Sequence, residues 1–429
     1  VGNLEIITIG DFEEDMAGER MDFAFSIVSP DTSQLGRWND EPLPAAALDV
    51  KAEFSGNAQE FAIQNIDANF GESHLAGSVD VSLAGSKPVF KVVANSNKID
   101  IRPFIDPGST GETDEENEPA VKERLIPATP LPLDALATAD MSVRLNVAEV
   151  QYWKASSRNL VLQAEMKAGN LDISEFSFEA PNGNLSTSLS VRPTGAGQAN
   201  VSIDLAADDL IFNRSGLPEE DLHKLPALNL DFQLVGKGGN LRELAGSTNG
   251  SFFLESSGGT LVGVDMSILE VFILEEVFRL LMPKSDQSGD SELSCLAAIL
   301  KVEDGVIKTD PGIAFTTDRM AIIAKGTLNL KTEKMKFNFN ATPTNALKIS
   351  PGELFNPYIL VGGTLSKPEV GIDPSKAILH GGAAIGTAGI SVLAKGLLDR
   401  VGNAMPLCEE MRKKVQLKMQ PVTAAGKKP

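Results

Sequence analysis

MSVRLNV, residues 141–147, alternates an apolar with a polar side chain at every position. The same pattern returns in LVLQAEM (160–166), LSTSLSV (185–191) and VSIDL (201–205). Alternation with a period of two predicts β-strands that have one apolar and one polar face. Turn residues lie between these segments, as in Pro181-Asn182-Gly183-Asn184 and Thr194-Gly195-Ala196-Gly197. Because short turns join consecutive strands side by side, we expect antiparallel meanders.

This alternation extends in both directions along the chain, whereas helical spacing is concentrated near the C-terminal end. Strand patterns recur at residues 4–9, 75–83, 228–234 and 335–341. Residues 265–282 instead place apolar side chains at helical spacing before Pro283, and a second helix is expected within residues 376–400. The sequence therefore predicts a mainly β protein, an elongated antiparallel sheet with a few C-terminal helices.

Composition excludes several classes of protein. The chain has 429 residues, 42% of them apolar and 6% aromatic, and a formal net charge of −20. Such an acidic chain repels phosphate backbones, so we expect no nucleic-acid partner. A length of 429 residues suggests two or three compact domains, but the repeated strands favour one elongated sheet.

No motif for metal binding or catalysis stands out. His74, His223 and His380 lie far apart, and Cys295 and Cys408 are separated by 113 positions, so no zinc motif is present. We find no nucleophile elbow, phosphate loop or paired histidines of a metalloprotease, and we expect no enzyme and no cofactor. Carboxylate pairs at Asp208-Asp209 and within Glu219-Glu220-Asp221 leave a carbohydrate-active enzyme as an alternative.

Three segments allow more than one interpretation. The acidic segment 106–118 has the composition of a solvated loop, with a calcium site as the alternative. Residues 377–394 contain no charged side chain, which permits a membrane span, but their glycines favour a small-residue helix packed on the sheet. Residues 412–428 carry six basic and no acidic residues, which indicates a frayed tail or a contact with anionic lipid.

Several segments look like one recurring unit of strand, glycine and alternating strand. They include residues 70–83, 244–254, 320–330 and 359–368. Together with Leu131-Pro-Leu-Asp-Ala-Leu, the 301–308 strand and the closing segment 361–374, they resemble the C-terminal part of AsmA-like proteins of the Gram-negative envelope. The family is related to TamB and to bridge-like lipid transfer proteins, in which a curled sheet forms an apolar groove for acyl chains.

The resemblance implies a periplasmic body, an inner-membrane anchor that this sequence does not contain, and a role in outer-membrane homeostasis. From the residues alone, a sandwich of two sheets is the commoner solution; with the resemblance, we expect a curled groove. We predict that the lipid-binding side chains of this groove are apolar residues of the alternating segments. A shift of one residue in the strand register would turn these side chains to the other face of the sheet. They are Leu75, Val79, Val81, Val143, Leu145, Leu162, Leu189 and Ile203.

The two cysteines are either unpaired and buried or joined to each other. An oxidising periplasm, implied by the resemblance, favours a Cys295–Cys408 disulfide, for which loop entropy gives about 4–5 kcal/mol. We expect four regions: residues 1–130 and 131–263 of the groove, a C-terminal region 264–408, and a basic tail 409–429.

The function expected is non-catalytic handling of phospholipid or another acyl lipid. The alternative is an envelope scaffold that affects outer-membrane protein insertion by binding protein partners through strand edges.

Overall fold

The computed structural model describes residues 4–15, 18–38, 41–104, 124–152, 155–211, 219–256, 258–261, 291–318, 320–343, 359–372 and 408–415. These residues are mainly in β-strands, so the predicted fold class is confirmed. The chain forms two compact units, unit 1 (Val1–Pro119 and Leu131–Val201) and unit 2 (Ala120–Pro130 and Ser202–Pro429). The predicted helices at 265–282 and 376–400 and the acidic segment 106–118 lie outside the described residues. The four predicted region boundaries stay predictions.

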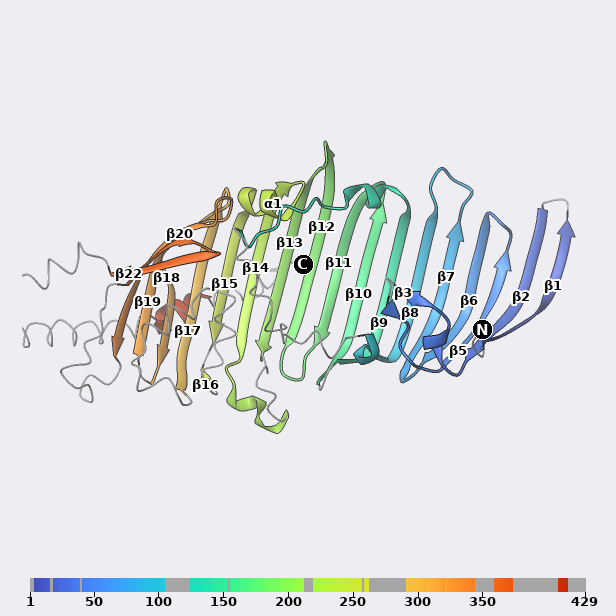
Figure 1. Cartoon of the computed structure of the whole chain (residues 1–429), viewed down its shortest axis with the longest axis horizontal. Coiled ribbons are helices and arrows are strands. Elements are labelled where there is room, and N and C mark those ends of the chain that lie inside the picture. The colour runs from blue at the N-terminus through green and yellow to red at the C-terminus, as the bar shows by residue number, and fades with distance from the viewer. Residues whose placement is uncertain are drawn as a thin grey trace, which may run out of the picture. The chain divides into compact units, whose positions relative to one another are not determined.

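Unit 1 is a sheet in which each strand pairs with the next one along the chain (Figure 1). A small two-stranded sheet of β3 (Arg37–Trp38) and β4 (Glu41–Pro42) lies in the connection after β2. The strands of the main sheet are β1 (Glu5–Asp15), β2 (Gly18–Ser29), β5 (Leu48–Gly56), β6 (Glu60–Phe70), β7 (Ser73–Ser82), β8 (Val89–Asp100), β9 (Asp140–Tyr152), β10 (Ala155–Lys167), β11 (Asn170–Glu179) and β12 (Asn184–Gly195).

One pair in unit 1, β8 and β9, is parallel. Val89 pairs with Asp140 at the start of both strands, so the chain must return along the whole strand length between them. The connection, residues 101–139, begins with a short 3-10 helix η2 (Arg102–Phe104) and ends with another, η4 (Leu133–Ala137). The prediction of antiparallel pairing is therefore correct for the other strand pairs described in the main sheet of unit 1 and wrong for β8 and β9.

Bulges interrupt the alternation in several strands. In β6, Asn65 adopts a positive φ of 49°, and the register with β7 shifts between Ile63 and Ile66. Asparagine tolerates the left-handed region better than other residues with a side chain. The extra residue places Ile63 and Ile66, three positions apart, on the same face of the sheet.

In unit 2, β14–β15–β17–β18–β19–β20–β21–β22 are consecutive antiparallel neighbours, and β16 also pairs with β17. These strands are β14 (Leu228–Gly238), β15 (Asn249–Ser256), β16 (Gly259–Leu261), β17 (Ser291–Glu303), β18 (Val306–Thr317), β19 (Met320–Asn329), β20 (Lys334–Pro343), β21 (Ile359–Thr364) and β22 (Lys367–Ile372). A 3-10 helix η5 (Glu219–Lys224) precedes β14, and a short helix α1 (Leu241–Ser247) joins β14 to β15. The remaining strand, β13 (Gln198–Leu210), spans the boundary between the units.

The sheet of unit 2 buries side chains on both faces. One face holds a core of large residues that includes Phe315, Ile322 and Phe339. The other carries small ones, and Ala297 and Ala314, which are directly paired, are completely buried. Small side chains on a sheet let another element approach closely.

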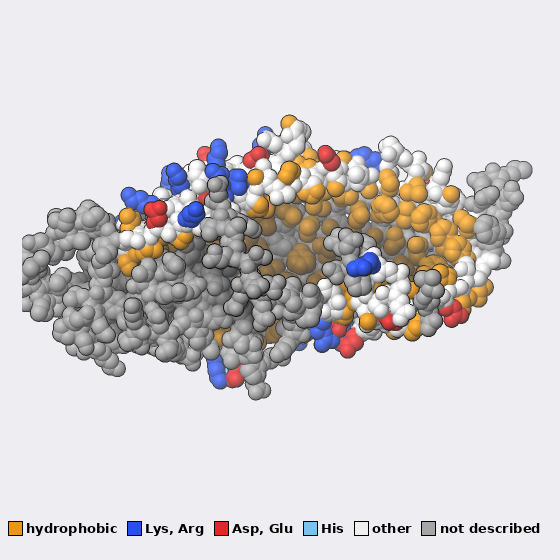
Figure 2. All heavy atoms as spheres, viewed as in Figure 1, with side chains coloured by type: hydrophobic (Ala, Val, Ile, Leu, Met, Phe, Trp, Pro, Cys, Tyr) orange, Lys and Arg blue, Asp and Glu red, His pale blue; other side chains and the backbone are white. Residues whose placement is uncertain are grey.

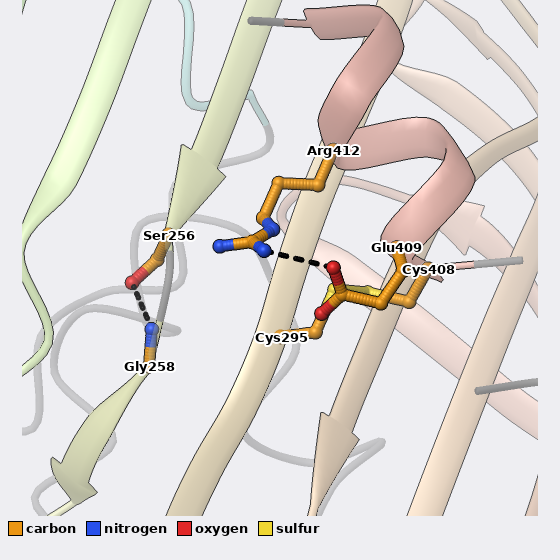
Figure 3. The surroundings of a disulfide bond; sticks show 6 residues. All are labelled: Ser256, Gly258, Cys295, Cys408, Glu409 and Arg412. Atoms are coloured by element: carbon orange, nitrogen blue, oxygen red, sulfur yellow. Dashed lines mark hydrogen bonds and ion pairs between the residues drawn. A yellow bond between two sulfur atoms is a disulfide. The ribbon is translucent and has the colours of Figure 1, made fainter. Parts of the chain in front are cut away.

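A disulfide-bonded helix covers this small-residue face. Residues 408–415 are helical, and Cys408 and Met411 pack against Cys295, Ala297 and Ala314 of β17 and β18. Cys295 and Cys408 are joined by a disulfide, as the sequence analysis expects. Figure 3 shows this bond beside the Arg412–Glu409 ion pair of the same helix.

Part of the long β8–β9 connection, the crossover segment (residues 124–130), packs within unit 2. The backbone amides of Leu125 and Ile126 each donate a hydrogen bond of 2.9 Å to the carboxylate of Glu333, which is completely buried. Arg242 of α1 donates from Nε and Nη2 to the carbonyl of Ile126. The crossover segment is therefore held by side chains from two separate elements.

Candidate functional site

The candidate site is one face of the sheet in unit 1. Directly paired residues of neighbouring strands lie on the same face, so the register traces rows across the sheet. The central row crosses nine strands and is apolar at every position: Phe23, Phe54, Ile63, Val79, Val92, Val143, Ala164, Ile173 and Leu189. We call the face that carries this row the apolar face.

The rows on either side of the central row are also mostly apolar. One consists of Gly56, Phe61, Val81, Phe90, Met141, Met166, Leu171 and Val191. The other consists of Ile66, Gly77, Ala94, Leu145, Leu162, Phe176 and Thr187. The three rows contain no charged side chain.

The opposite face has the reverse composition. One of its rows reads Ser55, Ala62, Asp80, Lys91, Ser142, Glu165, Asp172 and Ser190. Lys91 lies 3.8 Å from Asp80, an ion pair exposed to solvent. The sheet of unit 1 is thus polar on one face and apolar on the other.

The side chains of the apolar face are only partly buried. Val81 is 8% exposed and Leu75 is 36% exposed, and most of their neighbours are half-buried. Figure 2 shows hydrophobic side chains gathered in a hollow over the strands of unit 1. Because half-buried apolar rows retain contact with solvent, this face has capacity to bury further apolar surface.

Seven of the eight predicted lipid-binding residues lie together on the apolar face. Six of them belong to the three rows, and Leu75 lies beside them, paired with Ala68. The seven are Leu75, Val79, Val81, Val143, Leu145, Leu162 and Leu189. Ile203 is a half-buried residue of β13, outside these rows.

A charged network lies at the end of these strands. The carboxylate of Asp100, 7% exposed, accepts hydrogen bonds from the backbone amide, Nε and Nη2 of Arg102 at 3.0, 2.8 and 2.7 Å. These bonds hold the pKa of Asp100 below its usual 3.8, although burial opposes them, and the pKa of Arg102 is raised. Lys98 donates to Glu72 at 2.6 Å, which lowers the pKa of that carboxyl group.

The carboxylates singled out in the sequence lie on two separate elements, Asp208 and Asp209 on β13 and the others on η5. Asp208 and Asp209 are both exposed, and Asp221 forms an ion pair with Lys224 of the same 3-10 helix. His74 lies 3.2 Å from Asp67, an exposed carboxylate on the polar face. Among the described residues, no group of three or more His, Cys, Asp or Glu side chains is arranged to hold a metal ion.

Sequence reasoning missed two features of the site. Phe104 projects from η2 at the end of β8 and is 60% exposed, and its segment has no periodicity to reveal it. The bulge at Asn65 places Ile66 on the apolar face with Ile63, three positions earlier, which a strict period of two does not predict. A sequence signal exists only for the second feature, since asparagine is among the few residues that favour a positive φ.

The fold and the apolar face define a class of protein: a mainly β protein whose antiparallel sheet is apolar on one face and polar on the other. The sequence profile of the AsmA family matches residues 47–311, more than half of the chain. The chain therefore belongs to the AsmA family, as the resemblance of its recurring segments predicts. No curated protein and no solved structure matches the chain. The described helices include none that is long and apolar enough to cross a membrane.

Proposed function

We propose that this protein is a non-catalytic lipid-handling protein of the Gram-negative envelope, which binds acyl chains on the apolar face of unit 1. The observation that carries the proposal is the set of three adjacent rows without a charged side chain. A charged side chain on such a face would have to be desolvated by a bound hydrocarbon chain, at a cost of several kcal/mol. These rows impose no such cost.

The physical driving force is the hydrophobic effect. Each methylene group that an acyl chain buries contributes roughly 0.8 kcal/mol, and binding needs no covalent chemistry. Family membership supports a role in phospholipid transport and outer-membrane homeostasis, with a periplasmic body attached to the inner membrane. We propose no cofactor and no nucleic-acid partner.

Photocrosslinking tests this proposal. A photoreactive amino acid is introduced at Leu162, on the apolar face, and in a matched variant at Gln163, the next residue of β10 on the polar face. After irradiation in cells, we expect phospholipid adducts at residue 162 and far fewer at residue 163, as measured by mass spectrometry. Equal lipid labelling at both positions, or none at either, would contradict lipid binding on this face.

One observation favours a second function, binding of a protein partner by strand addition. In the described part of the chain, β1 pairs along one edge only, with β2. Ile6 is 60% exposed and Ile9 73% exposed, and residues 5–10 contain no lysine or proline of the kind that protects strand edges. Such an edge is suited to β-augmentation by another strand.

The same photocrosslinking method tests this second function. A photoreactive residue at Ile9 would label protein if β1 accepts a partner strand, and lipid or nothing if it does not. Protein adducts at residue 9 together with no lipid adducts at residue 162 would favour an envelope scaffold over lipid handling.

A further inference from the structure

Phe104 is an unusually exposed aromatic residue at the end of the apolar face. It is the last residue of η2, four positions after β8 ends at Asp100, and it is 60% exposed. Its ring centroid lies 5.3 Å from that of Phe70, the last residue of β6. Phe70 pairs with Leu48 and Ser73 at the ends of β5 and β7. We call this end of the strands the rim.

The rim extends the apolar face beyond the strands. Phe70 shares its face with Ala68 and Ile66, since all three alternate along β6 after the bulge. The ring of Phe104 continues this line of apolar side chains past the last strand residue. Among the described residues, the tilted ring of Phe70 contacts Phe104, which stays 60% exposed. So large an apolar side chain is poorly stabilised when it is exposed to water.

Neighbouring hydrogen bonds fix the backbone that carries Phe104. The buried carboxylate of Asp100 accepts from the backbone amide and the guanidinium of Arg102. The amide of Asp100 donates to Ser73 Oγ at 2.8 Å, and the amide of Phe104 donates to the carbonyl of Ile101 at 3.0 Å. The position of Phe104 at the rim is therefore set before any ligand binds, which reduces the entropy lost on binding.

The cations at the rim are already paired. Lys98 and Arg102 both contact Glu72, and Arg102 also binds Asp100. Two carboxylates thus balance two basic groups, so the described residues of this corner offer no excess positive charge to a phosphate group. The exposed surface that the rim offers to a ligand is therefore apolar, and Phe104 provides it.

We propose that Phe104 is an acyl-chain contact at the rim, where it covers the part of a bound lipid that extends past the ends of β6 and β8. This inference rests on the proposed lipid-binding function. It adds a specific residue outside the strands and assigns this end of the strands as a lipid contact. A hydrocarbon chain against the exposed ring buries apolar surface that no described protein residue covers.

Tryptophan fluorescence in the full chain tests the inference. Both native tryptophans are first removed by the substitutions Trp38→Phe and Trp153→Phe. A single tryptophan is then introduced at one new position in each variant. Phe104→Trp reports on the rim, Leu162→Trp on the apolar face, and Val28→Trp on the polar face at the same end of the strands, where Val28 pairs with Asp49. The probe is phosphatidylcholine with brominated acyl chains, compared with the unbrominated lipid.

We expect brominated lipid to quench the fluorescence of tryptophan at positions 104 and 162 and to leave the fluorescence of tryptophan at position 28 unchanged. Quenching at 162 without quenching at 104 would overturn the role of Phe104 and leave lipid binding intact. No quenching at either position would overturn both. Equal quenching at all three positions, including 28, would show unspecific adsorption and would also overturn the inference. A thermal melt of each variant confirms that it is folded.

Discussion

Glu333 shows how one buried side chain fixes a distant segment of the chain. It sits in the turn before β20 with a positive φ of 59°, and its carboxylate accepts the amides of Leu125 and Ile126, more than 200 residues earlier. A completely buried carboxylate is stable only when such donors replace its water.

Substitution of Glu333 by Ala should therefore destabilise unit 2. It removes two charge-assisted hydrogen bonds and leaves two amides unsatisfied, a loss of about 2–4 kcal/mol in the free energy of unfolding. Hydrogen exchange at residues 125 and 126 should speed up in the same variant. Glu369→Ala, at an exposed position of β22, is the control and should change stability little. Unchanged exchange at residues 125 and 126 would contradict this role.

Asp100 should make stability fall at acidic pH. Its pKa is lower in the folded state because Arg102 donates hydrogen bonds to it, so the unfolded chain binds the proton first as the pH falls. The stabilisation is present above the ordinary value of 3.8 and is lost as the pH drops through the lower folded pKa. In thermal melts, Asp100→Asn should have a lower melting temperature than the parent at pH 6, and this difference should become smaller toward pH 3. A difference that stays constant with pH would contradict the link between ionisation of Asp100 and stability.

Asp231 should behave in the opposite way. Burial, and then repulsion from Asp204 and Asp208, raises its pKa in the folded state. The unfolded chain therefore releases the proton at lower pH, and stability is lost as the pH rises through the raised pKa. Asp231→Asn removes this charge, so its melting temperature should exceed the parent's at pH 7 and match it below the ordinary value of 3.8. A variant less stable at pH 7 would refute this assignment.

At the scale of elements, the Cys295–Cys408 disulfide stabilises the packing of the helix of residues 408–415 on the sheet. Cys408, Met411 and Val415 are all at most 3% exposed, so the helix of residues 408–415 has one fully buried side. Among the described contacts, those of this short apolar side would remain without the bond, and a helix of about eight residues is marginal in isolation.

The Cys295→Ser, Cys408→Ser double variant should lose roughly 2–5 kcal/mol in the free energy of unfolding, because the bond closes a loop of more than 100 residues. Dithiothreitol should destabilise the parent protein and leave the double variant unaffected. Denaturant titrations under oxidising and reducing conditions measure both effects. Equal stability of the oxidised parent and the variant would show that packing alone holds the helix.

The alternation of residues 141–147, 160–166 and 185–191 predicts β9, β10 and β12 well, because each strand keeps one apolar face throughout. The same argument places seven of the eight predicted site residues on one face. Alternation identifies the apolar side of a strand, and that side is shared across the sheet once neighbouring strands pair in register.

Other features have no local signal in the sequence. Strand direction is not encoded in a period of two, so the parallel β8–β9 pair could not be distinguished from an antiparallel one. The contact of Glu333 with Leu125 joins residues far apart in the chain, which no local pattern predicts. Phe104 lies in a segment without periodicity, and its importance depends on the position of Phe70 after folding.

At the scale of the whole molecule, the distribution of charged residues leaves one face of the sheet in unit 1 suited to solvent and the other suited to an apolar ligand. The chain carries a net charge of −20, yet the three rows of the apolar face include none of its charged residues. Marginal stability is the rule for proteins, and a half-exposed apolar face lowers it further. A ligand that covers this face should therefore stabilise unit 1 as well as bind to it.

Lipid should thus raise the thermal stability of the delipidated protein. A ligand that binds only the folded state adds about 2.7 kcal/mol when its free concentration is 100 times its Kd. We expect phosphatidylcholine to increase the melting temperature of the parent and of Gln163→Glu, which adds a charge to the polar face. Leu162→Glu adds the same charge to the apolar face of the same strand and should abolish the increase, because a bound acyl chain would have to desolvate it. Scanning calorimetry with and without lipid measures the difference, and an equal increase in both variants would place the lipid somewhere other than the apolar face.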